Sequence, residues 1–402
     1  AGSSATGTAG IEVRAARRHF HRMTRRQSVP DVPTPALLLD LGVLERNIAA
    51  MAEKIRRLGA RLRPHVKTHK CIEVGRLQRD AGAQGITAAT LVEAKDFADH
   101  GFDDITWAFP VVTGRLDEVV ALAKRITFRV VVDSEAALDA VAAAGRAAGN
   151  AIHTWLKVDC GYHRVGVDPR VPSSLELVRR LNASRGIVFD GFLTHAGHGY
   201  SARNREELKR IAGEERSALV EFAARCRDAG QEIPAISIGS TPTMSVIENL
   251  DGVTEARPGN YVFNDWTQVA NGVCRAEDVA VTVLSTVVSH QPGSDHLVVD
   301  AGALSMSKDL GPSDQARGRG LGPVAKDLAG MAVEECVNLR SVSQEHGVVA
   351  GGSPADVEGR FAVGEKIRIV PNHSCLTAAL FDEYVVARGE EVQAHWKIWR
   401  GR

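Results

Sequence analysis

The stretch that decides the fold is ITFRVVVDSEAALDAVAAAGRAAGNAIHTWLKVD, residues 126–159. It begins with a run of β-branched residues, continues with a long alanine-rich stretch, and ends with a second apolar run. The middle stretch follows the capping residues Asp133 and Ser134 and closes on Gly149, as an α-helix does. The order therefore predicts a strand, a helix and a second strand, the unit from which parallel sheets are built.

The same alternation of strands and helices extends to both sides of this unit. The eight candidate strands are, in order, RLRPHV, GITAAT, DITWAF, ITFRVVV, IHTWLKVD, IVFDGFLTH, AISIGS and VTEARPGNYVF. Eight strands that alternate with helices over about 230 residues predict an α/β fold of the TIM type, a (β/α)8 barrel. A doubly wound open sheet is the alternative, but no G-x-G-x-x-G pattern follows the first strand.

After about residue 271 the pattern changes to short alternating strands separated by turn residues. These strands are expected in VAVTVLSTVVSH, HLVVDAG, EHGVV, EKIRIVPNHSC and DEYVVARG. We therefore expect a barrel domain over residues 28–270 and a mostly β domain over residues 271–402, with a strand near residues 30–41 as a candidate to pack on the latter. Residues 1–27 are small, polar or arginine-rich, which predicts a disordered tail or an organelle transit segment.

The composition argues against several classes of function. The chain of 402 residues has 49 basic and 49 acidic side chains, so its formal net charge is zero and neither nucleic acid nor an anionic membrane is indicated as a partner. No apolar run approaches the length of about 18 residues that a membrane span needs. The six cysteines are far apart and form no C-x-x-C pair, which favours a reducing compartment. We expect a cytoplasmic location, with an organelle as the alternative if residues 1–27 are a transit peptide.

Lys67 is the first candidate for a catalytic residue. It lies in RLRPHVKTHK, residues 61–70, near the end of a predicted barrel strand, where barrel enzymes hold their chemistry. The neighbouring Arg63, His65 and Lys70 are expected to lower the pKa of Lys67, and a neutral amine suits Schiff-base chemistry. A solvated basic rim that binds phosphate, or nothing, is the alternative.

A phosphate site is predicted in SIGSTPT, residues 237–243, between a strand and a helix. Backbone N–H groups at a helix N-terminus bind phosphate, and barrel phosphate sites favour the last two strands. The next segment, RPGNYVF, places Gly259 and Tyr261 nearby. Glycine–serine–threonine turns are common, so the pattern gains its weight from its position on the seventh strand.

A reactive lysine and a phosphate site in one barrel suggest pyridoxal 5'-phosphate as the cofactor. Arg164, in KVDCGYHRVGV, is a candidate partner for the pyridine nitrogen, and His195, in GFLTHAGHGY, is a candidate to lie flat against the ring. A surface ion pair for Arg164 and a structural role for His195 are the alternatives.

A metal site is predicted in VPNHSCLT, where His373 and Cys375 lie two residues apart on what reads as a β-type segment. Alternate residues of a strand point the same way, and imidazole with thiolate favours zinc. Two protein ligands would suit a catalytic ion with open positions for water and substrate. A buried free cysteine beside a histidine is the alternative.

Six motifs then occur in an order that resembles a known family. They are TPALLLDL, RPHVKTHK, GSTPT, RPGNYVFND, EHGVV and PNHSC. Together they are similar to the D-serine dehydratase and D-threonine aldolase family of fold type III pyridoxal-phosphate enzymes, from about residue 34 to the end of the chain. The resemblance implies an alanine-racemase-like barrel, a β domain and a homodimer with active sites at the interface.

The resemblance also implies roles for single residues. Lys67 would be the Schiff-base lysine, and Arg164 would face the pyridine nitrogen. His195 would occupy the ring-stacking position, where aldolase relatives have tyrosine. The residues expected to contact the cofactor are His65, Lys67, Arg164, His195, Gly239, Ser240, Thr241, Gly259, Asn260 and Tyr261, and those expected to bind the metal are His373 and Cys375.

Within the family, two markers resemble the dehydratases. Cys375 stands where typical D-threonine aldolases have aspartate and use manganese, and IGSTPT replaces their GGGTGS loop. The expected reaction is the conversion of D-serine, a small D-3-hydroxy amino acid, to pyruvate and ammonia. A D-threonine aldolase that gives glycine and acetaldehyde is the main alternative. A cofactor-binding homeostasis protein and an amino-acid racemase are more remote, because the former lacks a second domain and the latter needs a catalytic tyrosine motif that is not seen around Tyr384.

Overall fold

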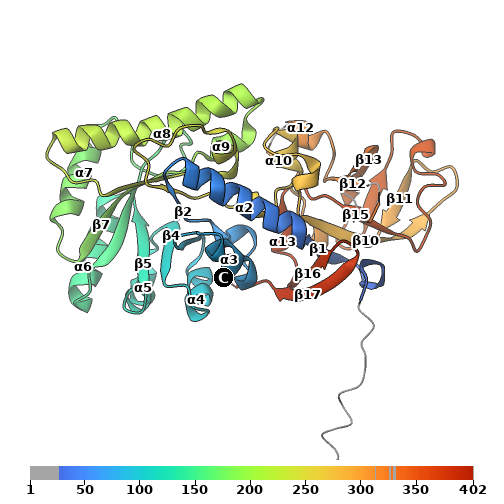
Figure 1. Cartoon of the computed structure of the whole chain (residues 1–402), viewed down its shortest axis with the longest axis horizontal. Helices are drawn as coiled ribbons and strands as arrows, with labels where there is room; N and C mark the ends of the chain where they lie inside the picture. The colour runs from blue at the N-terminus through green and yellow to red at the C-terminus, as the bar shows by residue number, and fades with distance from the viewer. Residues whose placement is uncertain (1–26, 313, 326, 329–331, 402) are drawn as a thin grey trace, which may run out of the picture.

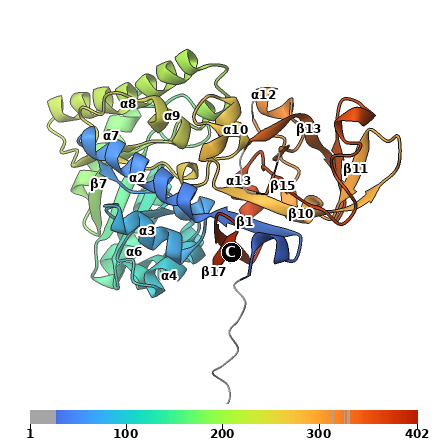
Figure 2. The same ribbon diagram turned by 45° about the vertical axis from the view of Figure 1, so that its right-hand side comes forward.

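The computed structural model of the protein describes residues 27–312, 314–325, 327–328 and 332–401. The prediction of a tail over residues 1–27 falls almost wholly outside the described residues. Within them, the chain forms two sheets that are built from different strands. Figures 1 and 2 show the two resulting domains side by side.

The first sheet is the predicted barrel of eight parallel strands. Its strand order is β2-β9-β8-β7-β6-β5-β4-β3, and a parallel bridge between His65 and Thr87 joins the two ends of this series. The strands are β2 (Arg61–Leu62), β3 (Ile86–Ala88), β4 (Asp104–Pro110), β5 (Thr127–Val132), β6 (Ile152–Lys157), β7 (Ile187–Leu193), β8 (Ala235–Ile238) and β9 (Glu255–Ala256). The predicted fold class is therefore confirmed.

Helices cover the outside of the barrel strands (Figure 1). They are α2 (Leu41–Arg57), α3 (Ile72–Asp80), α4 (Leu91–Asp99), α5 (Leu116–Ala123), α6 (Glu135–Ala148), α7 (Pro172–Ala183), α8 (Arg205–Asp228) and the short α9 (Thr241–Val246). Side chains cap their N-termini as the sequence predicts: the Ser134 hydroxyl accepts a hydrogen bond from the Ala137 N–H at the start of α6. One face of α6 then buries Leu138 and Val141 against the strands.

The second sheet forms the β domain and has nine strands in the order β11-β14-β13-β12-β15-β10-β1-β16-β17, with a further pairing of β11 to β10. The strands are β1 (Ala36–Asp40), β10 (Val281–His290), β11 (His296–Val299), β12 (Pro323–Ala325), β13 (Val333–Val342), β14 (Gly347–Ala350), β15 (Lys366–Ile369), β16 (Glu383–Arg388) and β17 (Glu391–Lys397). Strand β1 pairs antiparallel with β10 and parallel with β16. The described chain therefore starts in the β domain, builds the barrel and returns.

The two domains share one hydrophobic core, in which buried residues such as Leu156 of the barrel and Val283 of the β domain belong to the same cluster. Buried Tyr384 on β16 donates a hydrogen bond of 2.7 Å to the carbonyl of His69, which follows the first barrel strand. Such shared packing fixes the β domain against one end of the barrel. Among the described residues, no helix is both long and apolar enough to cross a membrane.

Candidate active site

A cavity of about 970 Å³ lies between the ends of the barrel strands and the β domain. Ten of the residues that the sequence analysis singles out line it: His65, Lys67, Arg164, His195, Gly239, Ser240, Gly259, Asn260, His373 and Cys375. They come from segments that are far apart in the sequence. They meet because the ends of parallel barrel strands share one face.

Two predicted cofactor residues, Thr241 and Tyr261, do not line this cavity. The Tyr261 hydroxyl accepts a hydrogen bond of 2.9 Å from Gln78, so the ring is held among buried groups away from the strand ends. Its backbone N–H donates to the Thr241 hydroxyl at 2.9 Å. The Tyr261 side chain is therefore not positioned to contact a ligand in the cavity, and only the backbone of this segment remains a candidate.

Lys67 lies in the short 3-10 helix η2 (Val66–Thr68), directly after the first barrel strand. Burial lowers its pKa, and the positive charges of Arg164 and Lys70 act in the same direction, while the Cys375 thiolate opposes them. The pKa of Lys67 is therefore lowered as expected, but the main cause is burial and not the neighbouring positive charges. Because Lys70 is itself paired with buried Glu93, its contribution is small.

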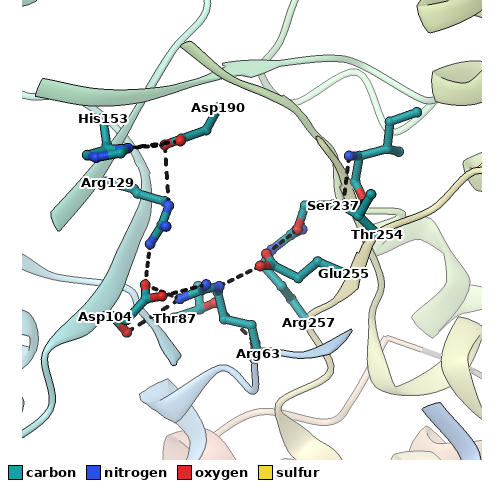
Figure 3. A network of polar contacts seen from close by, with 11 residues as sticks. Arg63, Thr87, Asp104, Arg129, His153, Asp190, Ser237, Thr254, Glu255 and Arg257 are labelled. Carbon is teal, nitrogen blue, oxygen red and sulfur yellow. Dashed lines mark hydrogen bonds and ion pairs between the residues drawn. The ribbon is translucent and has the colours of Figure 1, made fainter. Parts of the chain in front are cut away.

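Arg63 does not act on Lys67 as the sequence analysis expected. Its guanidinium is 3% exposed and pairs inside the barrel with Glu255 and Asp104, each at 2.6 Å (Figure 3). The pairing continues from Asp104 through Arg129 to Asp190, and from there to His153 at 2.9 Å. Of the basic residues near the first strand, His65 and Lys67 therefore line the cavity, whereas Arg63 pairs with carboxylates inside the barrel.

Glu255 connects this interior network to the cavity. One of its carboxylate oxygens accepts from Arg63, and the other accepts from the Ser237 hydroxyl at 2.5 Å. Ser237 in turn accepts from the Arg257 guanidinium (Figure 3). The same guanidinium also donates to the Thr194 carbonyl. Arg257 lines the cavity although its side chain is only 5% exposed. Burial lowers the pKa of Arg257 to about 10, and Glu255 limits this fall.

His65 and His195 line the same cavity as neutral imidazoles. For both, burial lowers the pKa well below the usual value, and the charge of Lys67 adds to the effect. The Nδ1 atom of His195 lies 3.4 Å from the Gly239 carbonyl oxygen. Uncharged rings of this kind suit packing against a flat aromatic ligand, as proposed for His195 from the sequence.

The predicted phosphate loop ends, as expected, at the N-terminus of a helix. Ser240 caps α9, and its hydroxyl accepts from the Thr243 N–H at 3.3 Å. Gly239 has φ +118°, and a Cβ there would lie 3.1 Å from the backbone nitrogen of Arg257, so glycine is needed at this turn. Among the described residues, the backbone N–H groups of Gly259 and Asn260 make no hydrogen bond to a backbone carbonyl, and both residues line the cavity.

His373 and Cys375 lie beside each other, although not on a strand as predicted. His373 precedes helix α13 (Ser374–Ala378), and Cys375 is in its first turn. The Nδ1 atom of His373 lies 2.7 Å from an Asp309 carboxylate oxygen. Burial opposes the charge of His373, but the hydrogen bonds to Asp309 and Cys375 raise its pKa to about 11. Burial also opposes the Cys375 thiolate, and His373 nevertheless lowers the thiol pKa.

This pair is not a complete cage for an ion. Among the described residues there is no group of three or more histidine, cysteine, aspartate or glutamate side chains that could hold a metal. Asp309 fixes His373 through Nδ1, which leaves Nε2 as the nitrogen for an ion. The donor set, one imidazole and one thiolate, fits a metal with other positions open to water or substrate.

Several residues of the cavity were not assigned a role from the sequence: Lys157, Tyr162, Tyr200, Arg257, Asp265, Gln268, Asp309 and Arg317. Lys157 and Arg257 stand at or just after barrel strands, so the rule that chemistry gathers at strand ends could have found them. Tyr200 belongs to the 3-10 helix η4 (Gly197–Ser201), and its hydroxyl lies within hydrogen-bond reach of Thr241. No periodic pattern marks such loop residues.

Comparison with known proteins places this geometry in a family. The model of the alanine racemase N-terminal domain matches residues 39–265, and that of the serine dehydratase domain matches residues 280–387. The chain belongs to this family of fold type III pyridoxal-phosphate enzymes. The resemblance read from the six motifs is thereby confirmed.

The relatives of the chain are dehydratases and aldolases. D-threo-3-hydroxyaspartate dehydratase of Delftia sp. strain HT23 is 41% identical over 92% of this chain and 97% of its own length. D-serine dehydratase of Dictyostelium discoideum is 34% identical over 90% and 95%, and D-threonine aldolase of an Arthrobacter species is 30% identical over 91% and 92%. The solved structure of the Delftia enzyme superposes with a TM-score of 0.88 at 40% identity, over 94% of this chain and 100% of that one.

Proposed function

We propose that the protein is a pyridoxal-phosphate-dependent lyase that dehydrates D-3-hydroxy amino acids, with D-serine converted to pyruvate and ammonia. One observation carries this proposal. The amine of Lys67, whose pKa is lowered by burial, opens into the same cavity as the His373 and Cys375 pair and the donors at α9. A proton acceptor, an anion site and a site for a Lewis acid are therefore available to one small substrate.

The cavity fits the cofactor by its unpaired polar groups. The Oδ1 atom of Asn260 and both amide atoms of Gln268 are buried without a partner among the described residues, and both side chains line the cavity. Buried polar groups seldom stay unpaired, so a polar ligand is expected here. Lys67 would hold the cofactor covalently, and the N–H groups of Gly259 and Asn260 with the Ser240 hydroxyl would hold its phosphate.

Two arginines are candidates for the residue opposite the pyridine nitrogen. Arg164, the residue chosen from the sequence, is exposed, and its guanidinium lies 5.0 Å from the centre of the Tyr162 ring. Arg257 is buried and held by Thr194 and Ser237. A fixed, desolvated cation influences a ring more strongly than an exposed one. We keep Arg164 as the predicted partner and add Arg257 as the better buried candidate.

When bound, the cofactor supplies an electron-accepting ring that stabilises negative charge at the substrate Cα. Burial lowers the pKa of Lys67, which favours the neutral amine, so its Nζ would accept the proton from Cα. His65 and His195 stay neutral and do not compete for that proton.

The pair His373 and Cys375 would hold a divalent ion, with zinc expected first and manganese as the alternative. Imidazole nitrogen and thiolate sulfur are the donors that zinc prefers. When bound, the ion acts as a Lewis acid on the β-hydroxyl of the substrate. Asp309 orients His373 for this task. One solved structure that is similar to this chain is of a D-threo-3-hydroxyaspartate dehydratase variant in a metal-free form, which supports the expectation of a metal.

The test of the proposal is to supply D-serine and D-threonine separately and to measure keto acid and glycine. Keto acid from either substrate supports a dehydratase, whereas glycine would make the protein an aldolase. Turnover of the L-enantiomers at equal rates would contradict the family assignment. Lys67→Ala should remove the visible absorbance of bound cofactor, whereas Lys157→Ala, which removes the other cavity lysine, should retain it.

We further propose that the protein is a homodimer in which a second copy covers the mouth of the cavity. Exposed apolar side chains line this cavity or follow a lining residue: Phe109 is 55% and Tyr162 36% exposed, and Leu376, directly after Cys375, is 45% exposed. Apolar groups clustered at one place indicate an interface. Sedimentation equilibrium should give twice the mass of one chain.

The cytoplasm is the proposed compartment, and the free cysteines support it. They are Cys71, Cys160, Cys226, Cys274, Cys336 and Cys375.

A further inference from the structure

Arg317 lines the cavity on the wall that the β domain provides, although no role was assigned to it from the sequence. It is the last residue of the short helix α12 (Asp314–Arg317). Its Nε atom donates to the Gly311 carbonyl at 3.1 Å, and one terminal nitrogen lies 3.5 Å from the Pro312 carbonyl. The guanidinium is thus directed by two backbone carbonyls of the loop that leads into α12.

The loop that directs Arg317 is tied to the metal-binding pair. The Gly311 N–H donates to one Asp309 carboxylate oxygen at 2.8 Å, and the other oxygen lies 2.7 Å from His373 Nδ1. At Gly311, with φ +80°, a Cβ would lie 2.8 Å from the Thr267 hydroxyl. The loop therefore packs closely against the segment after the last barrel strand, and Arg317 lies close enough to Asp309 for its charge to lower the pKa of that carboxyl group.

This place is where the substituent on the substrate Cβ must lie. In the proposed reaction the β-hydroxyl is directed to His373 and Cys375, so the third group on Cβ points to the wall beside them. That group is hydrogen in D-serine, methyl in D-threonine and carboxylate in a D-3-hydroxyaspartate. The β-domain residues that line the wall there are Asp309, Gly311, Pro312 and Arg317. They offer a methyl group little apolar surface but offer a carboxylate a guanidinium.

The charges of the cavity agree with an occupant that has more than one anionic group. Among the described residues that line it, Arg164, Arg257 and Arg317 carry guanidinium groups, and the carboxylates are Asp265 and Asp309. Arg317 pairs with Asp314 at 3.5 Å, and the Asp314 side chain is 96% exposed; the charge of Arg317 also lowers the pKa of Asp309. Exposed ion pairs of this kind contribute little, so Arg317 remains able to bind an anion.

We propose that the cavity prefers D-3-hydroxy amino acids that carry a second carboxylate on Cβ, and that Arg317 is the specificity residue that binds this carboxylate. This inference rests on the proposed function, because the position of Cβ follows from Lys67 and the metal-binding pair. The guanidinium donates hydrogen bonds to the distal carboxylate, which it matches in shape and charge.

The first test compares kcat/KM for D-threo-3-hydroxyaspartate and for D-serine. The unchanged protein should prefer the dicarboxylate, and Arg317→Gln should lower the ratio of the two values about tenfold or more, mainly through KM for the dicarboxylate. Arg317→Lys should retain part of the preference for the dicarboxylate, since lysine keeps the positive charge but not the paired N–H donors of the guanidinium. Arg340→Gln is the matched control, because Arg340 is also 53% exposed and pairs with a surface aspartate. A ratio that is the same in Arg317→Gln and in the unchanged protein would overturn the inference.

The second test measures binding without turnover. Malate and 3-hydroxypropanoate correspond to 3-hydroxyaspartate and serine without the amine, so they differ only by the distal carboxylate. Titration calorimetry should show that malate binds about tenfold more tightly to the unchanged protein and that Arg317→Gln removes the difference. Equal affinities in the unchanged protein would refute the carboxylate subsite.

The two proposals fail in different ways. If no amino acid is turned over but malate is bound through Arg317, the proposed reaction is wrong and the subsite stands. If D-serine and the dicarboxylate are processed equally and Arg317→Gln changes neither value, the reaction stands and the subsite is wrong. The visible absorbance of bound cofactor shows that each variant is folded, and Arg317→Lys replaces Arg317→Gln if that variant does not fold.

Discussion

Replacing Glu255 with glutamine would remove one negative charge from the centre of the barrel without changing the size of the side chain. The Glu255 side chain is 1% exposed and lies 2.6 Å from Arg63, which is 3% exposed. Burial opposes ionisation of Glu255, but Arg63 and Arg257 lower its pKa, so the carboxylate form is the native one. The substitution leaves Arg63 with Asp104 alone and leaves Arg257 with Ser237 and a backbone carbonyl.

The expected cost follows from what remains buried. Breaking a buried pair by removing one partner costs about 3–5 kcal/mol, because the other charge stays desolvated. That is a large part of the net stability of a typical protein, about 5–15 kcal/mol. Because Arg63 keeps its contact with Asp104, which is one-third exposed, we expect Glu255→Gln to lower the free energy of unfolding by about 3 kcal/mol, the low end of that range.

Equilibrium unfolding in urea, followed by circular dichroism, would measure this change. The midpoint should fall while the slope with urea stays the same, since the exposed surface does not change. Arg340→Gln, which breaks a surface pair with Asp295, should cost no more than about 1 kcal/mol. A loss below about 1 kcal/mol in Glu255→Gln would mean that water or protonation already compensates the charge, and the account of the interior network would be wrong.

Three further predictions concern the cavity. His373→Ala and Cys375→Ala should each lower the zinc retained after dialysis, as measured by mass spectrometry, whereas Cys336→Ala, at an exposed position, should retain it. Burial lowers the pKa of Lys157 to about 7, so above pH 7 the unfolded chain binds more protons than the folded one. The free energy of unfolding should therefore rise from pH 7 to pH 10. Lys157→Met should make that rise smaller, as measured by urea unfolding at each pH. Tyr200→Phe should raise the cofactor dissociation constant several-fold, measured by absorbance titration, because the hydroxyl lies beside the phosphate loop.

The barrel could be predicted from the sequence because its elements are local. Each strand and helix carries its own periodicity and caps, and a single rule about parallel strands then brings their ends together. Lys67 and His195 are far apart in the chain, and both line the cavity as that rule requires. A D-serine dehydratase and a D-threonine aldolase are both similar to this chain over about nine-tenths of its length, so the motifs identified the family but not the reaction.

What the sequence did not reveal depends on contacts between distant segments. Arg63 stands two residues from His65 in a basic run, so both are expected on the same side of the strand, and the run does not show how deep in the barrel each side chain lies. Only the closed barrel brings Glu255 from β9 and Asp104 from β4 to Arg63. In the same way, Asp309 lies in a loop with no periodic pattern, and its contact with His373 joins segments more than sixty residues apart.

The structure also bears on which of two lysines performs the chemistry. Lys67 and Lys157 both line the cavity, and burial lowers the pKa of each. A dehydratase must remove the Cα proton and direct loss of the hydroxyl from the adjacent Cβ, so its base must lie near the site that holds the β-hydroxyl. The charge of Cys375 acts on Lys67, whereas Lys157 responds to Arg257 and Cys160 on the barrel side. Of the two lysines, Lys67 is therefore the one that Cys375 influences, and retention of visible absorbance in Lys67→Ala but not in Lys157→Ala would reverse this assignment.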